Sequence, residues 1–273
     1  AQDTISVGLP SMLAAKLCRK KFIIRVPGDY VWEQSVQRFG VKDSIDDFQT
    51  KRYGWRVEFL RRVQKLVVDR ADIVITPSEY FWQLVSKWVK NPGKVKVIYN
   101  GIDLTTNYSL PTTHSKSKVI ISAGRLVPWK GFDFLIELMR DLPDWKLVIA
   151  GDGPEYANLK SQISNLKLQD RVELLGQIPR DELMQKMSAS DIFILDTSFE
   201  SFSFQVVEAM SLGLPVVTTN IGNLSEIIEN GVDGILVEPN DKKQFLEAID
   251  KLDKDENFRE SIFEKAKTKA QKF

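Results

Sequence analysis

The stretch SFESFSFQVVEAMSLGLPVVTT, residues 198–219, decides the fold of the second half of this chain. It follows the apolar run DIFILD, so Glu200 falls in a loop and Glu208 in a short predicted helix that ends at Gly213. The free N–H groups at the start of such a helix can bind phosphate, and the two acids can bind sugar hydroxyls on either side of it. Without context, a pair of glutamates eight positions apart more often lies on a solvated surface.

A second motif, SAGRLVPWKGFDFLI, residues 122–136, places Arg125 and Lys130 between a predicted strand and a predicted helix. Two cations at the carboxyl end of a strand suit a diphosphate, because Arg chelates oxygens and Lys supplies a point charge. The strand WKLVIAG then ends in the turn 151–154, Gly-Asp-Gly-Pro, at the sheet edge where α/β proteins bind ligands. Taken alone, that turn is ordinary loop chemistry.

Five segments follow one another in a characteristic order: GRLVPWKG, GDGPEYANL, RVELLGQIPRDEL, SFESFSFQVVEAMSLGLPVV and GNLSEIIENGVDGILVEPND. In this order they resemble the retaining glycosyltransferases of family 4. The resemblance implies an α/β protein of the GT-B type. It divides the chain into a partial N-terminal Rossmann-like domain (1–98), an interdomain linker (99–117) and a near-complete C-terminal Rossmann-like domain that binds a nucleotide-sugar donor (118–273). It also implies a fragment truncated at both ends, a minimal enzyme being the alternative.

The resemblance further assigns roles to residues. Arg125 and Lys130 would stabilise the diphosphate leaving group, Glu200 would bind the donor sugar and Glu208 the ribose, with the nucleobase against the main chain at 176–178. The donor-binding set that it implies is Gly124, Gly151, Gly153, Ile178, Ser201, Phe202, Ser203, Val207 and Glu208. The glycines at 151 and 153 would let the backbone pass close to the ligand.

Two departures from the family pattern bear on substrates. Many relatives have glycine where this chain has Ser201 and Ser203, and serine adds a Cβ where glycine permits positive φ, so the sugar pocket is expected to be reshaped. Many relatives also place a histidine after the strand that corresponds to FIIRVPG, where this chain has Asp29. Asp29 is either an acceptor-side residue that orients or deprotonates a hydroxyl, or a turn residue. Trp32 beside it lines a sugar-binding wall or belongs to the core.

Composition excludes several classes of site. The formal net charge of the 273 residues is +1, which gives no drive toward nucleic acid. One histidine and one cysteine make a histidine triad, a multi-histidine metal site or an internal disulfide hard to build. No D-x-D stands at a strand end, so we expect no metal and no cofactor, with the two cations in the place of the metal. No apolar run is long enough to span a bilayer.

The function that the resemblance implies is transfer of a sugar from a nucleotide-diphosphate sugar to an acceptor hydroxyl with retention of anomeric configuration. The resemblance implies a glycan or lipid-linked acceptor, a cytoplasmic location and peripheral association with the inner membrane surface. Two alternatives stay open: a nucleotide-sugar epimerase of the same architecture, and a catalytically silent nucleotide-binding chain.

Periodicity predicts the elements around these motifs. In the first domain it predicts helices over 11–20, 51–70 and 79–90, with strands in FIIRVPG, ADIVITPS and KVKVIYNGID, and hence a parallel sheet. In the second it predicts strands near 118–123, 146–150, 171–175, 192–195, 214–218 and 235–237.

Overall fold

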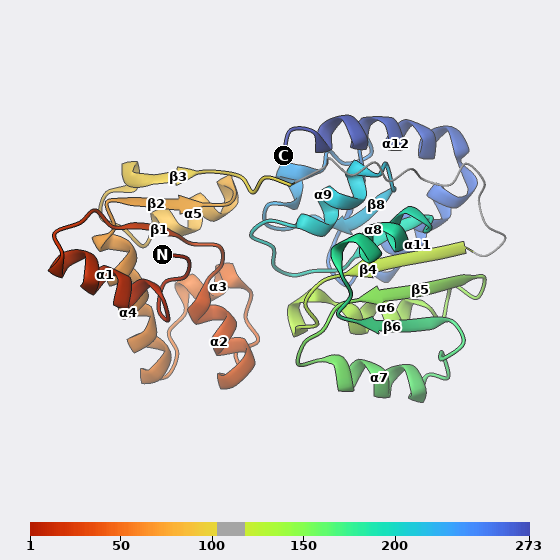
Figure 1. Ribbon diagram of the computed structural model, residues 1–273. Helices are drawn as coiled ribbons and strands as arrows, with labels where there is room; N and C mark the ends of the chain where they lie inside the picture. Colours follow the sequence, from red (N-terminus) through yellow and green to blue (C-terminus); the bar gives the residue numbers. More distant parts are fainter. Residues whose placement is uncertain (103–117) are drawn as a thin grey trace. The chain divides into compact units, whose positions relative to one another are not determined.

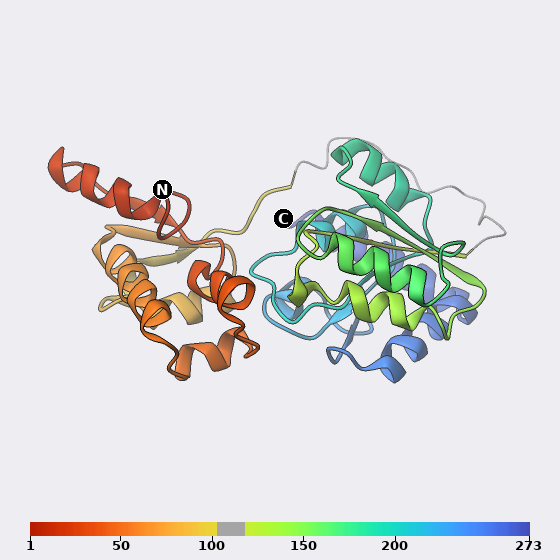
Figure 2. The ribbon, with the colours of Figure 1, turned by 90° about the horizontal axis from the view of Figure 1, so that it is seen from below.

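The computed structural model describes residues 1–102 and 118–273 (Figures 1 and 2). The chain divides into two compact units, Ala1–Asn100 and Gly101–Phe273. Most of the predicted linker, 99–117, lies outside the described residues.

The first unit is built on a parallel three-stranded sheet in the order β1-β2-β3. Its elements are α1 (Gly8–Leu17), β1 (Ile23–Arg25), α2 (Tyr30–Phe39), α3 (Ile45–Thr50), α4 (Trp55–Arg70), β2 (Ile73–Thr76), α5 (Glu79–Ser86), the 3-10 turn η1 (Pro92–Lys94) and β3 (Val95–Val97). α1 and α2 both pack against α4. The parallel sheet agrees with the sequence-based expectation.

The connection between β1 and β2 contains three helices, where periodicity predicted one over 51–70. α2 is capped at its start by the Asp29 carboxylate, which accepts from Val31 N and Trp32 N, and it ends at Gly40, whose φ is +68°. α3 starts at a Ser44 cap, and α4 begins at Trp55. The sequence analysis missed α2 and α3, of 10 and 6 residues, although their caps are visible in the sequence.

The second unit contains a parallel six-stranded sheet in the order β6-β5-β4-β7-β8-β9 (Figure 1). The strands are β4 (Lys118–Ala123), β5 (Trp145–Ala150), β6 (Val172–Gly176), β7 (Ile192–Leu195), β8 (Val216–Thr219) and β9 (Ile235–Val237). Between and after them lie η2 (Pro128–Lys130), α6 (Phe132–Leu138), α7 (Tyr156–Asn165), α8 (Arg180–Ser188), α9 (Phe204–Ser211), α10 (Leu224–Ile227), α11 (Lys242–Lys254) and α12 (Glu256–Ala270). All six predicted strands are present, shifted by two residues at most.

Helices cover both faces of this sheet. Alternate strand residues point to opposite faces, so Ile120 of β4 joins the core that α6, α7 and α11 complete, and Ile121 joins the core under α8, α9, α10 and α12. The central strands β7 and β8 are buried along their whole length, as expected for a parallel sheet covered on two sides.

The strand order reverses direction between β4 and β7, which are paired neighbours although β5 and β6 separate them in sequence. At such a switch point the loops at the carboxyl ends of the two strands run apart and leave a crevice. The loop after β4 carries Arg125 and Lys130, and the loop after β7 carries Glu200. The topology therefore brings together the two motifs that the sequence separates by 70 residues.

Candidate functional site: the carboxyl edge of the second sheet

The loops after β4 and β7 are joined by hydrogen bonds to one carbonyl oxygen. Trp129 O of the first loop accepts from Ser198 N (2.8 Å) and from Thr197 Oγ1 (2.9 Å) of the second. Thr219, at the end of β8, donates from its hydroxyl to Thr197 O at 2.6 Å. These buried bonds fix the height of the β7 loop above the sheet edge.

Lys130 and Glu200 form an ion pair across this crevice. Their side chains are 12% and 8% exposed, so both charges are largely withdrawn from water. A Cβ placed on Gly124 would lie 3.8 Å from Lys130 Nζ, so the ammonium group also lies against the end of β4. Two predicted catalytic residues are thus in direct contact, with one neutralising the other.

Arg125 lines a cavity of about 320 Å³ beside the ion pair. The cavity lies between the ends of three strands and the first turns of two helices, and it is lined by Ala123, Gly124, Arg125, Ala150, Gly151, Asp152, Gln177, Ile178, Leu183 and Gln205. Gly124, Arg125, Gly151 and Ile178 were predicted as site residues. Gln177 was expected near a nucleobase, whereas Asp152, Leu183 and Gln205 were not singled out.

The glycines at 151 and 153 have a packing role that the sequence did not predict. A Cβ on Gly151 would overlap Gly124 O, and a Cβ on Gly153 would overlap Leu126 O. Gly151 also has a φ of +147°, which L side chains rarely adopt. The absence of side chains here lets the loops after β4 and β5 pack backbone against backbone. Gly151 also lines the cavity, so close approach of its backbone to a ligand stays a prediction.

Glu208 lies in the second turn of α9 and is paired with Arg180, the first residue of α8. Arg180 Nε donates to Glu208 Oε1 at 2.7 Å, and the glutamate side chain is buried while that of Arg180 is half-exposed. Sequence analysis did not single out Arg180. Its place directly after Ile178-Pro179 in a quoted motif was the one available signal.

The segment 201–203 leads into α9 with ordinary backbone angles. Ser203, the N-cap of α9, has φ −98° and ψ 101°, and neither it nor Ser201 is among the non-glycine residues with positive φ. Serine at these two positions therefore needs no left-handed backbone, and the reshaping of the sugar pocket stays a prediction. Ser203 is buried, and its hydroxyl has no hydrogen-bond partner among the described residues.

Two predicted donor-binding residues have their side chains in the core, which leaves only their backbone groups for a donor. Val207 is fully buried in the apolar cluster under α9, so its side chain supports the helix. Phe202 is also buried, and its ring meets those of Phe204 and Phe273 with centroids 5.4 and 5.8 Å apart. Phe202 thus anchors the loop that carries Glu200.

Asp196 is a buried acid at the end of β7 that sequence analysis missed. Burial raises its pKa to about 6, and the hydrogen bond from Asn240 N (3.0 Å) opposes the shift only in part. A Cβ on Gly131 would overlap both the main chain and the carboxylate of Asp196, so this acid lies directly under the Lys130-Gly131 turn.

Residues 111–269 match the family model described as Glycosyl transferases group 1. The chain belongs to this family.

Curated relatives of this glycosyltransferase chain include an uncharacterized glycosyltransferase of Methanocaldococcus jannaschii, 33% identical over 210 residues, which cover 71% of this chain and 54% of the relative. Another is a D-inositol 3-phosphate glycosyltransferase of Mycobacterium sp. (strain KMS), 30% identical over 204 residues, 69% of this chain and 46% of the relative. The chain spans about half the length of these relatives. Among solved structures, Anabaena HepE in complex with UDP and glucose has a TM-score of 0.81 at 24% identity, over 97% of this chain and 70% of that one. This likeness shows that the fold is GT-B.

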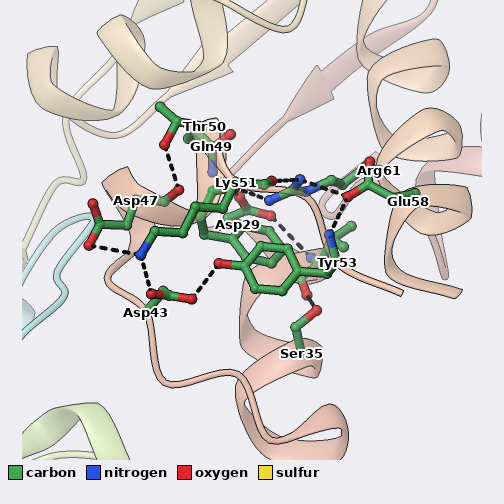
Figure 3. A network of polar contacts seen from close by, with 12 residues as sticks. Asp29, Ser35, Asp43, Asp47, Gln49, Thr50, Lys51, Tyr53, Glu58 and Arg61 are labelled. Carbon is green, nitrogen blue, oxygen red and sulfur yellow. Dashed lines mark hydrogen bonds and ion pairs between the residues drawn. The ribbon is translucent and has the colours of Figure 1, made fainter. Parts of the chain in front are cut away.

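In the first unit of the glycosyltransferase chain, Asp29 is a structural residue (Figure 3). It is buried, its Oδ1 accepts from Val31 N and Trp32 N at 3.1 Å and from Gln64 Nε2 at 2.9 Å, and its Oδ2 accepts from Gln49 Nε2 at 2.9 Å. Burial raises the pKa of the carboxyl, against the lowering effect of these bonds. With both oxygens engaged, Asp29 caps α2, and the alternative of a turn residue is the one that its contacts support. Trp32 likewise lies in the core, where its Nε1 donates to Asp43 O.

The described part of the chain, 1–102 and 118–273, contains no group of three or more His, Cys, Asp or Glu side chains arranged to bind a metal ion. Within the same residues no helix has the length and apolar character needed to cross a bilayer.

Proposed function

We propose that this protein transfers a sugar from a nucleotide-diphosphate sugar to an acceptor hydroxyl with retention of anomeric configuration. The observation that carries the proposal is the Lys130–Glu200 pair at the sheet's switch point, next to the cavity that Arg125 lines. This arrangement offers cations for a diphosphate and an acid for sugar hydroxyls within one crevice, as a nucleotide sugar requires.

Binding of the donor exchanges the partners of this pair. Lys130 turns from Glu200 to the β-phosphate, and Glu200 accepts hydrogen bonds from hydroxyls of the donor sugar. Glu208 binds the ribose. Its carboxylate already accepts a hydrogen bond from Arg180, so it is within reach of a hydrogen-bonding group outside α9. The nucleobase occupies the part of the cavity at Gln177 and Ile178.

In the reaction, the bond between the anomeric carbon and the β-phosphate oxygen breaks, and a bond from the acceptor oxygen to that carbon forms on the same face. The acceptor proton leaves with the diphosphate or to water. Arg125, Lys130 and the N–H groups at the start of α9 stabilise the charge that develops on the leaving group. In this proposal these groups neutralise the negative charge of the diphosphate without a metal ion. The acceptor is a glycan or lipid-linked hydroxyl compound.

Isothermal titration with UDP, the nucleotide bound by the neighbour HepE, tests the clamp. Arg125→Ala and Lys130→Ala should each weaken binding by about 1.5–3 kcal/mol, the range for charge-assisted hydrogen bonds. Lys146→Ala is the matched control, because Lys146 is an exposed lysine of β5 outside the crevice. Unchanged affinity in both site variants, or binding abolished by a chelator, would remove the metal-free clamp.

A further inference from the structure

Helix α8 begins with a cation, although the electrostatics of a helix favour acids at this end. Arg180 is its first residue, after the Pro179 N-cap, and Asp181 and Glu182 follow in the first turn. The positive end of the helix dipole disfavours a cation at this position. Local structure thus gives no reason for Arg180, and a residue that departs from local preference often serves a functional site.

A tertiary contact joins Arg180 to Glu208 of α9. Arg180 Nε donates to Glu208 Oε1 at 2.7 Å, and the two side chains are 42% and 8% exposed. Ion pairs between two exposed, flexible side chains contribute little to stability. In this pair the acid is withdrawn from water, and a buried carboxylate needs such a partner to remain ionised.

The pair lies beside the cavity that opens at the ends of the strands. Leu183 of α8 lines this cavity and follows Arg180 by three positions. Gln205 of α9 also lines it and precedes Glu208 by three positions. Residues three apart share one face of a helix, so the pair and the cavity wall occupy the same faces of α8 and α9.

Glu208 keeps the capacity to bind a ligand while it is paired. Its Oε1 accepts from Arg180, whereas its Oε2 has no hydrogen-bond partner among the described residues. Oε2 is also not one of the enclosed polar atoms that lack both a partner and contact with solvent. Because an ionised carboxylate accepts at both oxygens, Glu208 can bind the two neighbouring hydroxyls of a ribose without releasing Arg180.

We propose that Arg180 is a positioning residue for ribose recognition. It holds the Glu208 carboxylate ionised and in one orientation beside the cavity, and the chain therefore selects ribonucleotides over 2′-deoxyribonucleotides. A carboxylate that is oriented before the ligand arrives loses less conformational freedom on binding, so its hydrogen bonds to the diol contribute more to affinity. This inference rests on the proposed function, because Glu208 has a ribose to bind only if the donor is a nucleotide sugar.

Isothermal titration of the full chain with UDP and with 2′-deoxy-UDP tests the inference. The quantity that decides is the selectivity, the ratio of the two dissociation constants. We expect the natural chain to bind UDP at least about tenfold more tightly than 2′-deoxy-UDP, the loss typical of one charge-assisted hydrogen bond. Arg180→Gln should lower this selectivity to about threefold or less, and Arg180→Lys, which keeps the charge, should retain most of it.

The selectivity separates positioning from two simpler roles of the cation. If Arg180 only stabilised the fold, or only attracted the diphosphate through its charge, its loss would weaken both nucleotides alike and leave the ratio unchanged. Lys186→Gln is the matched control, because Lys186 is an exposed cation of the same helix and its replacement changes the net charge equally. Circular dichroism verifies that each variant is folded.

Glu208→Gln completes a double-mutant cycle with Arg180→Gln. Once the carboxylate is absent, Arg180→Gln should have no further effect on the selectivity. The inference is wrong if the natural chain binds UDP and 2′-deoxy-UDP equally, if Arg180→Gln keeps or raises the selectivity, or if Lys186→Gln lowers it as much. It is also wrong if Arg180→Gln still lowers the selectivity of the Glu208→Gln variant. A natural chain that binds neither nucleotide would overturn the proposed function together with this inference.

Discussion

Replacing Glu200 by Gln separates the two proposed roles of the Lys130–Glu200 pair, binding of the diphosphate by Lys130 and binding of the donor sugar by Glu200. The carboxylate pairs with the ammonium group that, in the proposed function, binds the diphosphate, and both side chains are about nine-tenths buried. A nucleoside diphosphate must break this pair before Lys130 can bind it. Gln keeps the size of the side chain and one acceptor oxygen but removes the charge.

The size of the effect follows from the two kinds of hydrogen bond. A hydrogen bond that involves a charged group contributes about 1.5–3 kcal/mol; the ion pair, with two charges, lies near the upper end of this range, and a bond from the ammonium group to a neutral amide, with one charge, lies near the lower end. The ligand therefore displaces a partner that is weaker by roughly 1 kcal/mol, and we expect UDP to bind Glu200→Gln about fivefold more tightly than it binds the natural chain. A UDP-sugar should lose that advantage, because its hydroxyls meet a neutral acceptor in place of the carboxylate.

Isothermal titration with UDP and with UDP-glucose measures both effects on one preparation. Glu137→Gln is the matched control, since Glu137 is paired with Arg140 on an exposed helix surface, where such a pair contributes little. If Glu200→Gln weakens UDP as much as Lys130→Ala does, the carboxylate is not a competitor for the ammonium group and the partner exchange is wrong.

Three further predictions concern other acids. Glu208→Gln should weaken the binding of UDP and of UMP alike by about 1.5–3 kcal/mol, because both nucleotides contain the ribose that Glu208 is proposed to bind; a loss confined to UDP would contradict this ribose contact. Asp196 has a folded-state pKa of about 6, above its unfolded value, so the folded protein binds its proton more tightly and loses stability as the pH rises from 4 to 7. Asp196→Asn should therefore be more stable than the natural chain at pH 7 by about 2–3 kcal/mol and equal to it near pH 4, in urea titrations at each pH; parallel pH profiles would refute this. Asp29→Asn should lower the free energy of unfolding of the first unit by about 1–3 kcal/mol, since Gln49 would then meet an amide donor, and it should leave UDP affinity unchanged; a loss of transfer without a loss of stability would restore the acceptor-side role.

The sequence predicted the second unit better than the first. In residues 118–273 the strands are apolar runs bounded by turn residues, so the local pattern places each of them. In residues 1–100 the short helices α2 and α3 follow one another, and too few turns are present in each for its period to stand out, so their caps are the clearest marks. Arg125, Lys130, Glu200 and Glu208 were predicted as site residues from their residue types and from the resemblance of the segments that carry them, and their roles stay predictions.

Tertiary structure decided the contacts among these residues. The pairing of Lys130 with Glu200 depends on β4 and β7 being neighbours, and nothing local specifies that two strands separated by two others will pair. Arg180 and Asp196 became visible only with the fold, since an ion-pair partner and a raised pKa arise from burial and distance rather than from residue type. For the same reason only the fold shows that the Val207 side chain lies in the core and that the Asp29 carboxylate caps a helix, in agreement with the turn-residue alternative for Asp29. Sequence thus determined which chemistry the chain can offer, and packing determined which side chains are free to offer it.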